Sequence, residues 1–281
     1  MGTHPLQSRF AQAALPLEVA QAPFVPASGA ERVVQLDIAR DRRGERFRMW
    51  PGASTNRVVV QGVDRRLHQL VLLVDEPKHR FLAEIPRWTV PDRPVVRKEG
   101  HRRWVSMETP GQKRHFLLGL DEAHLFIAQL PRGLSSVDRA REALKGREVA
   151  RAERDAPFRT IRQGEWFLIA LDAPRVAALD DVARLAPHLV AHRRGIAQAA
   201  LWNRAGRPHV ADEVLVLRAE QLLARSVGEA VARSVALARP GVYVRGKVKH
   251  PDHATVELKS WRLALPNAES FHQPAGVFWV D

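Results

Sequence analysis

The segment VYVRGKVKHPDHATVEL, residues 242–258, decides the fold class. Apolar residues alternate with polar ones on both sides of a central His-Pro-Asp-His, and this period of two is typical of a β-strand with one buried face. A Pro-Asp pair favours a tight turn. We therefore predict a β-hairpin with antiparallel strands, whose tip carries His250, Asp252 and His253.

The sequence around this hairpin mixes strands with helices. A broad apolar face over 218–238 predicts one long helix, which Pro240 and Gly241 end, and a shorter helical pattern covers 176–185. Further strands are expected at 166–171, 210–217, 261–265 and 277–280. We therefore predict that residues 160–281 form the smaller α+β domain.

The first half of the chain has a different texture. Residues 1–30 are rich in proline and alanine and predict an arm without regular structure. Residues 31–146 predict a mainly antiparallel β domain that ends in a helix, with Ser135 or Ser136 as its N-cap. Its β-like runs are 33–38, 47–50, 57–61, 70–74, 80–85, 103–107, 115–119 and 124–129. The charged stretch 147–159 is expected to be a linker, either helical or irregular, and the fold class as a whole is α+β.

Composition excludes several classes of protein. The chain has 281 residues, 45% of them hydrophobic, so it can bury a core without disulfides. It has no cysteine, which excludes thiolate zinc sites, iron–sulfur clusters and cysteine nucleophiles. Neither a phosphate-binding P-loop nor a Gly-x-Gly-x-x-Gly or Gly-x-Ser-x-Gly motif occurs, which disfavours P-loop ATPases, Rossmann dehydrogenases and α/β-hydrolases.

Apolar residues form no stretch long enough for a membrane span, and the first residues lack the pattern of a secretory signal. We therefore expect a cytoplasmic protein with no membrane partner.

Charge is the strongest functional signal. The formal net charge is +13, and 37 of the 44 cationic residues are arginine. A GC-rich coding sequence also produces such a skew, but a field of this size attracts polyanions, and the guanidinium fork binds phosphate with two donors. We expect DNA or RNA as the partner, or a protein with an acidic surface.

Several arginines stand beside aromatic residues, a pattern suited to phosphate neutralisation with base stacking. The alternative is that they occupy the solvent face of ordinary strands, since Arg46 and Arg48 alternate with Phe47 and Met49. The candidate nucleic-acid-binding residues are Arg42, Arg43, Arg46, Arg48, Arg65, Arg66, Arg102, Arg103, Arg193 and Arg194.

Histidines and carboxylates suggest a metal site. His250 and His253 flank the expected turn, and His209 shares one strand face with Glu213. If these four side chains converge, they form a mixed site suited to Zn²⁺, Mn²⁺ or Fe²⁺. The alternative is that the histidines are turn and surface residues.

Three further carboxylates could act beside such a metal. Asp212 and Asp252 are candidate catalytic bases or partners of the ligands. Glu165, at the start of the strand 166–171, is a candidate general base or ligand. The alternative for that segment is that Gly164 makes a turn and the following aromatic pair is core.

A set of motifs in the last 120 residues resembles a group of uncharacterised bacterial proteins. The motifs are QGEWF at 163–167, HVAD at 209–212 and VRG followed by HPDH over 244–253. No activity is known for that group. The resemblance implies that the C-terminal half is a recurring module, and it assigns no catalytic residue or cofactor.

Three functions remain open at this point. The first is association with nucleic acid through arginine-rich surfaces. The second is a metal-dependent hydrolase, of the phosphodiesterase kind, that uses the His/carboxylate site. The third is a structural subunit of a larger assembly.

Overall fold

The computed structural model describes residues 4–25, 29, 31–86, 88–155, 160–201, 207–218 and 229–268. Its strands are mostly antiparallel and lie in several sheets alongside helices, which confirms the α+β class. The described residues form two compact units, one ending at Leu144 and one that spans Lys145–Ala268. Each unit is described by itself below.

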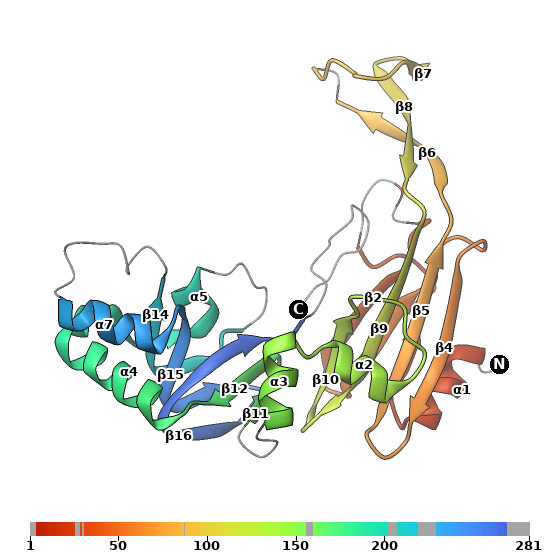
Figure 1. Ribbon diagram of the computed structural model, residues 1–281. Coiled ribbons are helices and arrows are strands. Elements are labelled where there is room, and N and C mark those ends of the chain that lie inside the picture. The colour runs from red at the N-terminus through yellow and green to blue at the C-terminus, as the bar shows by residue number, and fades with distance from the viewer. Residues whose placement is uncertain are drawn as a thin grey trace. The chain divides into compact units, whose positions relative to one another are not determined.

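The first unit is built mainly of strands (Figure 1). All eight runs expected between residues 31 and 146 are strands, whereas β1 and β7 were not expected. The elements are α1 (Pro5–Gln12), β1 (Leu17–Val19), β2 (Gln35–Asp41), β3 (Gly44–Trp50), β4 (Arg57–Asp64), β5 (Gln69–Glu76), β6 (His79–Ile85), β7 (Val95–Glu99), β8 (Arg102–Thr109), β9 (Gln112–Asp121), β10 (His124–Gln129) and α2 (Val137–Ala143).

Strand β5 is the centre of this unit. It lies inside a four-stranded sheet of order β10-β9-β5-β4 and is buried on both faces. Leu70 and Leu72 pack with Phe47 of the three-stranded sheet β1-β3-β2. Val71 points the other way and packs with the helix α2 through Ala140. Because successive side chains of a strand point to opposite faces, one apolar strand joins both layers.

The expectation of an irregular arm over residues 1–30 was wrong. Residues Pro5–Gln12 form the helix α1, with Pro5 in the first turn and the side chain of His4 as its cap. Proline is favoured at this position because its missing N–H has no helical partner there. Leu6 and Phe10, four residues apart, are buried on one face, and the Phe10 ring meets that of Phe47 edge-on at 5.7 Å.

The second unit contains a six-stranded antiparallel sheet of order β11-β12-β16-β15-β14-β13. Its elements are α3 (Arg147–Asp155), β11 (Thr160–Gln163), β12 (Trp166–Ala170), α4 (Ala173–Leu185), the 3₁₀ turn η1 (Pro187–Leu189), β13 (Val190–Gly195), α5 (Ile196–Ala200), β14 (Val210–Leu217), α7 (Glu229–Ala238), β15 (Gly241–His250) and β16 (His253–Pro266).

Helices pack on this sheet. Leu179 of α4 and Val235 of α7 share a buried cluster with Tyr243 and Trp261 of the sheet. The segment 147–159, expected to be a linker that is helical or irregular, begins with the helix α3, whose Val149 is buried against β12. The predicted hairpin exists as β15 and β16, and β16 continues through both strands expected at 254–258 and 261–265.

The long helix expected over 218–238 is described only in its last part, α7. Residues 219–228 and the strand expected at 277–280 lie outside the described residues. Within the described part of the chain, no helix is both long and apolar enough to cross a bilayer.

Glu76, at the end of β5, carries a buried charge. Its side chain is 2% exposed and accepts hydrogen bonds from the Val34 amide at 2.6 Å and the Gln112 amide group at 3.0 Å. It also forms an ion pair with Arg114, which is 6% exposed. Burial lowers the pKa of Arg114, and the Glu76 carboxylate opposes that effect.

We predict that Glu76→Gln destabilises the first unit by about 3–5 kcal/mol, because it leaves the Arg114 charge buried without its counter-ion. The matched control is Glu99→Gln, which breaks the exposed pair with Arg97 and should cost about 1 kcal/mol or less. The measurement is the free energy of unfolding in urea. Equal losses of unfolding free energy for the two variants would show that the buried ion pair stabilises the unit no more than an exposed pair does.

Candidate metal centre

Three histidines lie at one end of the second unit's sheet. His209 immediately precedes β14, His250 ends β15 and His253 begins β16. These strands are neighbours in the order β16-β15-β14. His250 and His253 face each other across the hairpin, and Val210 pairs with Lys249 on the adjacent strand. The strand order therefore places all three imidazoles together.

The three rings are nearly parallel and close. Ring centroids lie 4.2 Å apart for His209 and His250, 5.4 Å for His209 and His253, and 4.9 Å for His250 and His253. One nitrogen from each ring can be chosen so that all three lie within 4.8 Å of one another. Among the described residues, this is the one such group of three that could hold a metal ion.

His209 is the buried member of the group. It is 3% exposed, and neither ring nitrogen has a hydrogen-bond partner in the described part of the chain. Its Nδ1 lies 3.4 Å from a carboxylate oxygen of Glu165, and its ring meets Trp166 edge-on at 6.5 Å. A buried polar group without a hydrogen bond costs about 1–3 kcal/mol, so this ring is poised for a ligand.

His250 is held by two backbone contacts. Its Nδ1 accepts a hydrogen bond from the Asp252 amide at 3.1 Å, and its Nε2 lies 3.1 Å from the Arg207 carbonyl. Burial lowers the pKa of His250, and the neighbouring His209 and His253 lower it further against the opposing effects of the Arg207 carbonyl and Asp252, which favours the neutral ring. Neutral imidazole is the form that binds a metal. Ligation through Nδ1 would replace the Asp252 contact and keep the Nε2–H donor to the carbonyl, the usual outer contact of a ligating histidine.

The turn between β11 and β12 closes over these rings. Gly164 has φ +57°, and a Cβ placed there would lie 2.6 Å from Nε2 of His253 and 3.0 Å from Nε2 of His209. The buried side chain of Gln163 donates to the carbonyls of Val248 at 3.2 Å and Ala254 at 2.7 Å, one on each strand of the hairpin. The turn and the hairpin tip are thereby joined.

The same turn brings a carboxylate to the group. Glu165 is about one third exposed, at 32% of its side chain, and lies beside the buried His209. Its backbone carbonyl accepts a hydrogen bond from Asn267 at 2.7 Å, which holds the turn to the end of β16. Glu165 can therefore reach both solvent and the imidazole group.

The donor set fits a borderline divalent metal. Three neutral imidazoles and one carboxylate suit Zn²⁺, Mn²⁺ or Fe²⁺. In a tetrahedral zinc site with bonds of about 2.0–2.1 Å, ligand nitrogens lie about 3.3 Å apart, so ligation would draw these nitrogens together by at most about 1.5 Å. Three protein ligands leave a further position for water or substrate, as in catalytic zinc sites.

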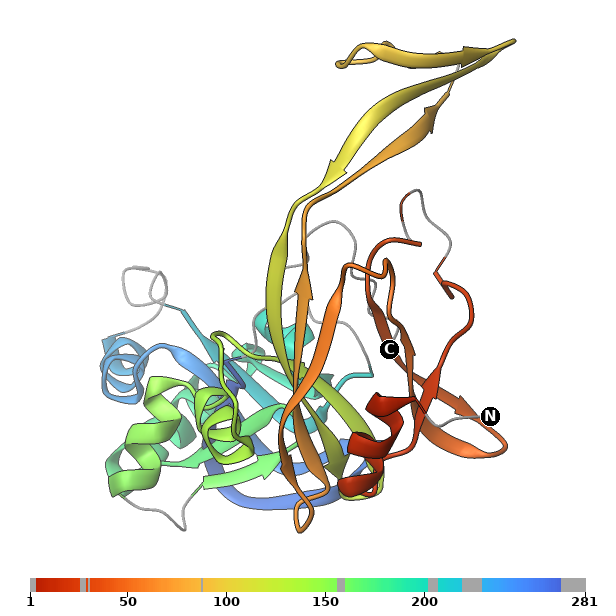
Figure 2. The ribbon, with the colours of Figure 1, turned by 90° about the vertical axis from the view of Figure 1, so that its right-hand side faces the viewer.

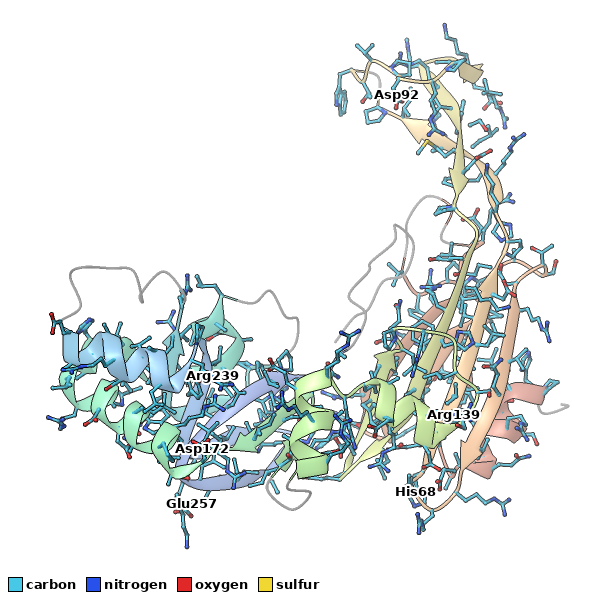
Figure 3. All side chains as sticks on the ribbon, viewed as in Figure 1. His68, Asp92, Arg139, Asp172, Arg239 and Glu257 are labelled. Carbon is cyan, nitrogen blue, oxygen red and sulfur yellow. The ribbon has the colours of Figure 1, made fainter. Side chains whose placement is uncertain are left out.

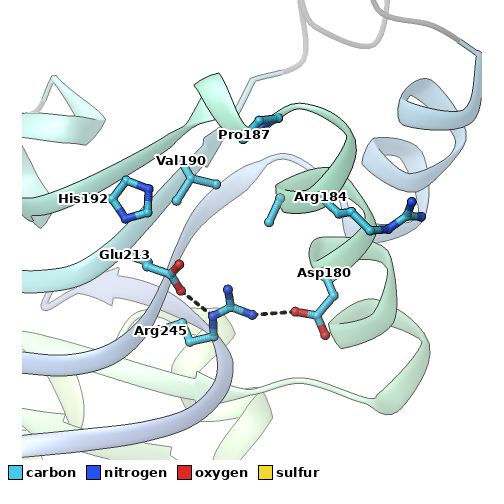
Figure 4. A pocket seen from close by; sticks show the side chains of 8 residues that line it. Asp180, Arg184, Pro187, Val190, His192, Glu213 and Arg245 are labelled. Atoms are coloured by element: carbon cyan, nitrogen blue, oxygen red, sulfur yellow. Dashed lines mark hydrogen bonds and ion pairs between the residues drawn. The ribbon is translucent and has the colours of Figure 1, made fainter.

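The structure does not bring Glu213 to this group. Its carboxylate pairs with Arg245, which also donates to Asp180 of α4 at 2.7 Å (Figure 4). These residues border a cavity of about 290 Å³, and Arg245 lies 4.5 Å above the Trp261 ring. Glu213 therefore belongs to a separate ion-pair network between the sheet and α4.

The two candidate aspartates occupy different places. Asp212 accepts the amide of Lys247 at 2.8 Å and lies against Gly246, where it supports the irregular pairing of β14 and β15. Asp252 lies in the hairpin turn beside His250, 3.9 Å from the Arg207 guanidinium. Asp252 is thus next to the imidazole group, whereas Asp212 supports the backbone.

Ion pairs occupy several of the ten candidate arginines. Arg46 pairs with Glu18 and Asp41, and Arg48 pairs with Asp37. Phe47 and Met49 are buried, as expected for a strand with a polar outer face. Arg65 and Arg103 donate to backbone carbonyls, and Arg102 lies 3.7 Å from Glu84. The other candidates are exposed in turns or on β13: Arg42, Arg43, Arg66, Arg193 and Arg194.

Comparison with protein-family models, with curated proteins and with solved structures finds no match to this chain. The resemblance of its C-terminal motifs to a bacterial group therefore stays a prediction.

We predict that Gly164→Ala destabilises the second unit more than backbone strain alone would. The matched control is Gly100→Ala, since Gly100 has φ +56° with no atom within 4 Å of the added Cβ. Both variants force alanine into the left-handed backbone region, which costs about 1–2 kcal/mol of stability. Gly164→Ala also overpacks the imidazoles, which adds about 1–3 kcal/mol.

Urea unfolding of the unit that contains each glycine measures the two losses. Equal losses would mean that the imidazoles move aside freely and that the turn does not hold them.

Proposed function

We propose that this protein is a metal-dependent hydrolase of phosphodiester bonds, with a divalent Zn²⁺, Mn²⁺ or Fe²⁺ bound by His209, His250 and His253. One observation carries the proposal: the buried His209 has no hydrogen bond to either ring nitrogen and stands in a group of three imidazoles. A metal ion is a ligand that three neighbouring imidazoles can bind at once, and it would satisfy the buried His209.

The bound metal would lower the pKa of a coordinated water to near 7. Glu165 is placed to accept the proton of that water, since its carboxylate lies beside His209 and reaches solvent. In hydrolysis the water oxygen would bond to phosphorus as the bond to the leaving oxygen breaks, and Glu165 would pass the proton that it accepted to that leaving oxygen. The Arg207 carbonyl would hold His250 through Nε2 while Nδ1 binds the ion.

Two arginines favour an anionic substrate. The Arg207 side chain is 65% exposed, and its carbonyl contacts His250. Arg162 donates to the Gly164 carbonyl at 2.9 Å, within the turn that covers the histidines. Guanidinium groups from two segments that contact this group suit a phosphate oxygen, because each offers several donors in a plane.

We predict about one bound metal per chain in protein purified without a histidine tag or chelator. The double variant His250→Ala with His253→Ala should lose it, because one remaining imidazole cannot hold the ion. The matched control is His188→Ala with His192→Ala, which removes two exposed histidines of the same unit. Elemental analysis gives the result, and less than about 0.1 metal per chain with no gain on adding Zn²⁺ or Mn²⁺ would refute the site.

We predict that Glu165→Gln keeps the metal but lowers the hydrolysis of bis(p-nitrophenyl) phosphate by about 10²–10⁴-fold, as expected for loss of a general base. Glu213→Gln is the control, since that carboxylate pairs with Arg245. A metal-loaded wild type that does not hydrolyse this ester or oligonucleotides would make the centre structural. A Glu165→Gln variant at the wild-type rate would assign the base elsewhere.

A further inference from the structure

A β-sheet arm extends from the first unit. Strands β6, β8 and β7 form a three-stranded sheet in the order β6-β8-β7. Figures 1 and 2 show β6 and β8 rising away from the four-stranded sheet as continuations of β5 and β9. Short breaks at 77–78 and 110–111 separate the arm from that sheet. With eight residues in β8, the arm is about 26 Å long.

Four of the seven large apolar side chains that are exposed among the described residues lie on the arm. Trp88 is 86% exposed, Val90 91%, Val96 61% and Leu82 45%. Of the arm's described apolar residues, Val105 alone is buried. Figure 3 shows side chains around the labelled Asp92 projecting into open space. Exposed apolar groups gathered on one projection mark a surface for contact with a partner.

Hydrogen bonds hold the loop at the end of the arm in a defined conformation. The Arg103 guanidinium donates to the carbonyls of Pro86 and Thr89, both at 2.9 Å, and the Thr89 amide donates to the Pro86 carbonyl at 3.0 Å. Arg93 donates to the Ser106 carbonyl at 3.3 Å. These hydrogen bonds lie on both sides of Trp88 in the sequence and order the loop that carries it. Binding at the exposed indole should therefore cost little further conformational entropy of the loop.

The arm is also positively charged. Residues 78–109 contain eight Lys or Arg but only four Asp or Glu, an excess denser than that of the chain as a whole. Ion pairs use part of this charge, since Glu108 binds Lys78 and Arg80. Arg93 and Lys98 are exposed and pair with no carboxylate among the residues described here. The arm therefore attracts polyanions close to an exposed indole.

We propose that this arm binds single-stranded nucleic acid, with an unpaired base stacked on Trp88 and with Arg93 and Lys98 on backbone phosphates. An exposed aromatic side chain on a segment with cations that pair with no carboxylate is the arrangement of single-strand binding surfaces. A duplex is a poorer ligand, because its bases are already stacked and must be separated to reach the indole. An acidic protein would use the cations but has no unpaired base for Trp88.

The experiment measures binding of labelled oligo(dT)₂₀ to the full chain by fluorescence anisotropy, with EDTA present so that hydrolysis at the metal centre does not interfere. Trp88→Ala should weaken binding roughly 10-fold, and Trp88→Phe should restore most of it because the ring remains. Unfolding curves verify that the exposed substitutions leave the fold intact. Equal affinity of the wild type and Trp88→Ala would overturn the proposal.

The double variant Arg93→Gln with Lys98→Gln should reduce the slope of log affinity against log salt by about 1.4, which corresponds to two phosphate contacts on a single strand. The matched control, Arg132→Gln with Arg139→Gln, removes two exposed cations of the same unit outside the arm and should leave the slope unchanged.

Two further outcomes count against the proposal. One is competition by poly-glutamate as strong as that by oligo(dT)₂₀, which would indicate an acidic protein partner. The other is tighter binding to the matching duplex than to the single strand.

Discussion

The candidate metal centre depends on the close approach of one turn to two imidazole rings. At residue 164 a single added carbon would come within 2.6 Å of Nε2 of His253, so only glycine leaves room. The left-handed backbone there, φ +57°, also favours glycine. The amide of Gln163 then holds both hairpin strands to the same turn. The cover over His209 and the position of Glu165 depend on this contact, whereas the strand pairing sets the spacing of the rings.

Part of this centre could be predicted from the sequence, and part could not. Alternation around His-Pro-Asp-His predicts the hairpin that pairs His250 with His253, because turn and period are local properties. The proximity of His209 depends on strand order, which no local pattern shows. Glu213 was assigned wrongly to the same place because it shares a strand face with His209. Four residues along a strand span about 13 Å, so a shared face does not mean a shared site.

The first unit shows the same limit. Its strands follow from apolar runs between breakers, but proline-rich segments misled the prediction in two places. Pro5 begins the helix α1, where Leu6 and Phe10 have helical spacing and a helix start accepts proline. The strand β7 follows closely after Pro94, and only its partner β8 identifies it as part of a sheet. Whether a segment next to a proline forms a helix or a strand therefore depends on the residues against which it packs.

Net charge describes a whole chain, whereas binding depends on which cations remain available. Arg46 and Arg48 stand in an alternating strand whose inner face is core, and carboxylates opposite them take up their charge. An ion-paired arginine must give up its partner before it neutralises a phosphate, so such residues add little to polyanion affinity. Arg93 and Lys98 have no such cost, and they stand on the arm that exposes Trp88. Cations on strands that face few carboxylates, as on this arm, are therefore among those that remain available for an anion.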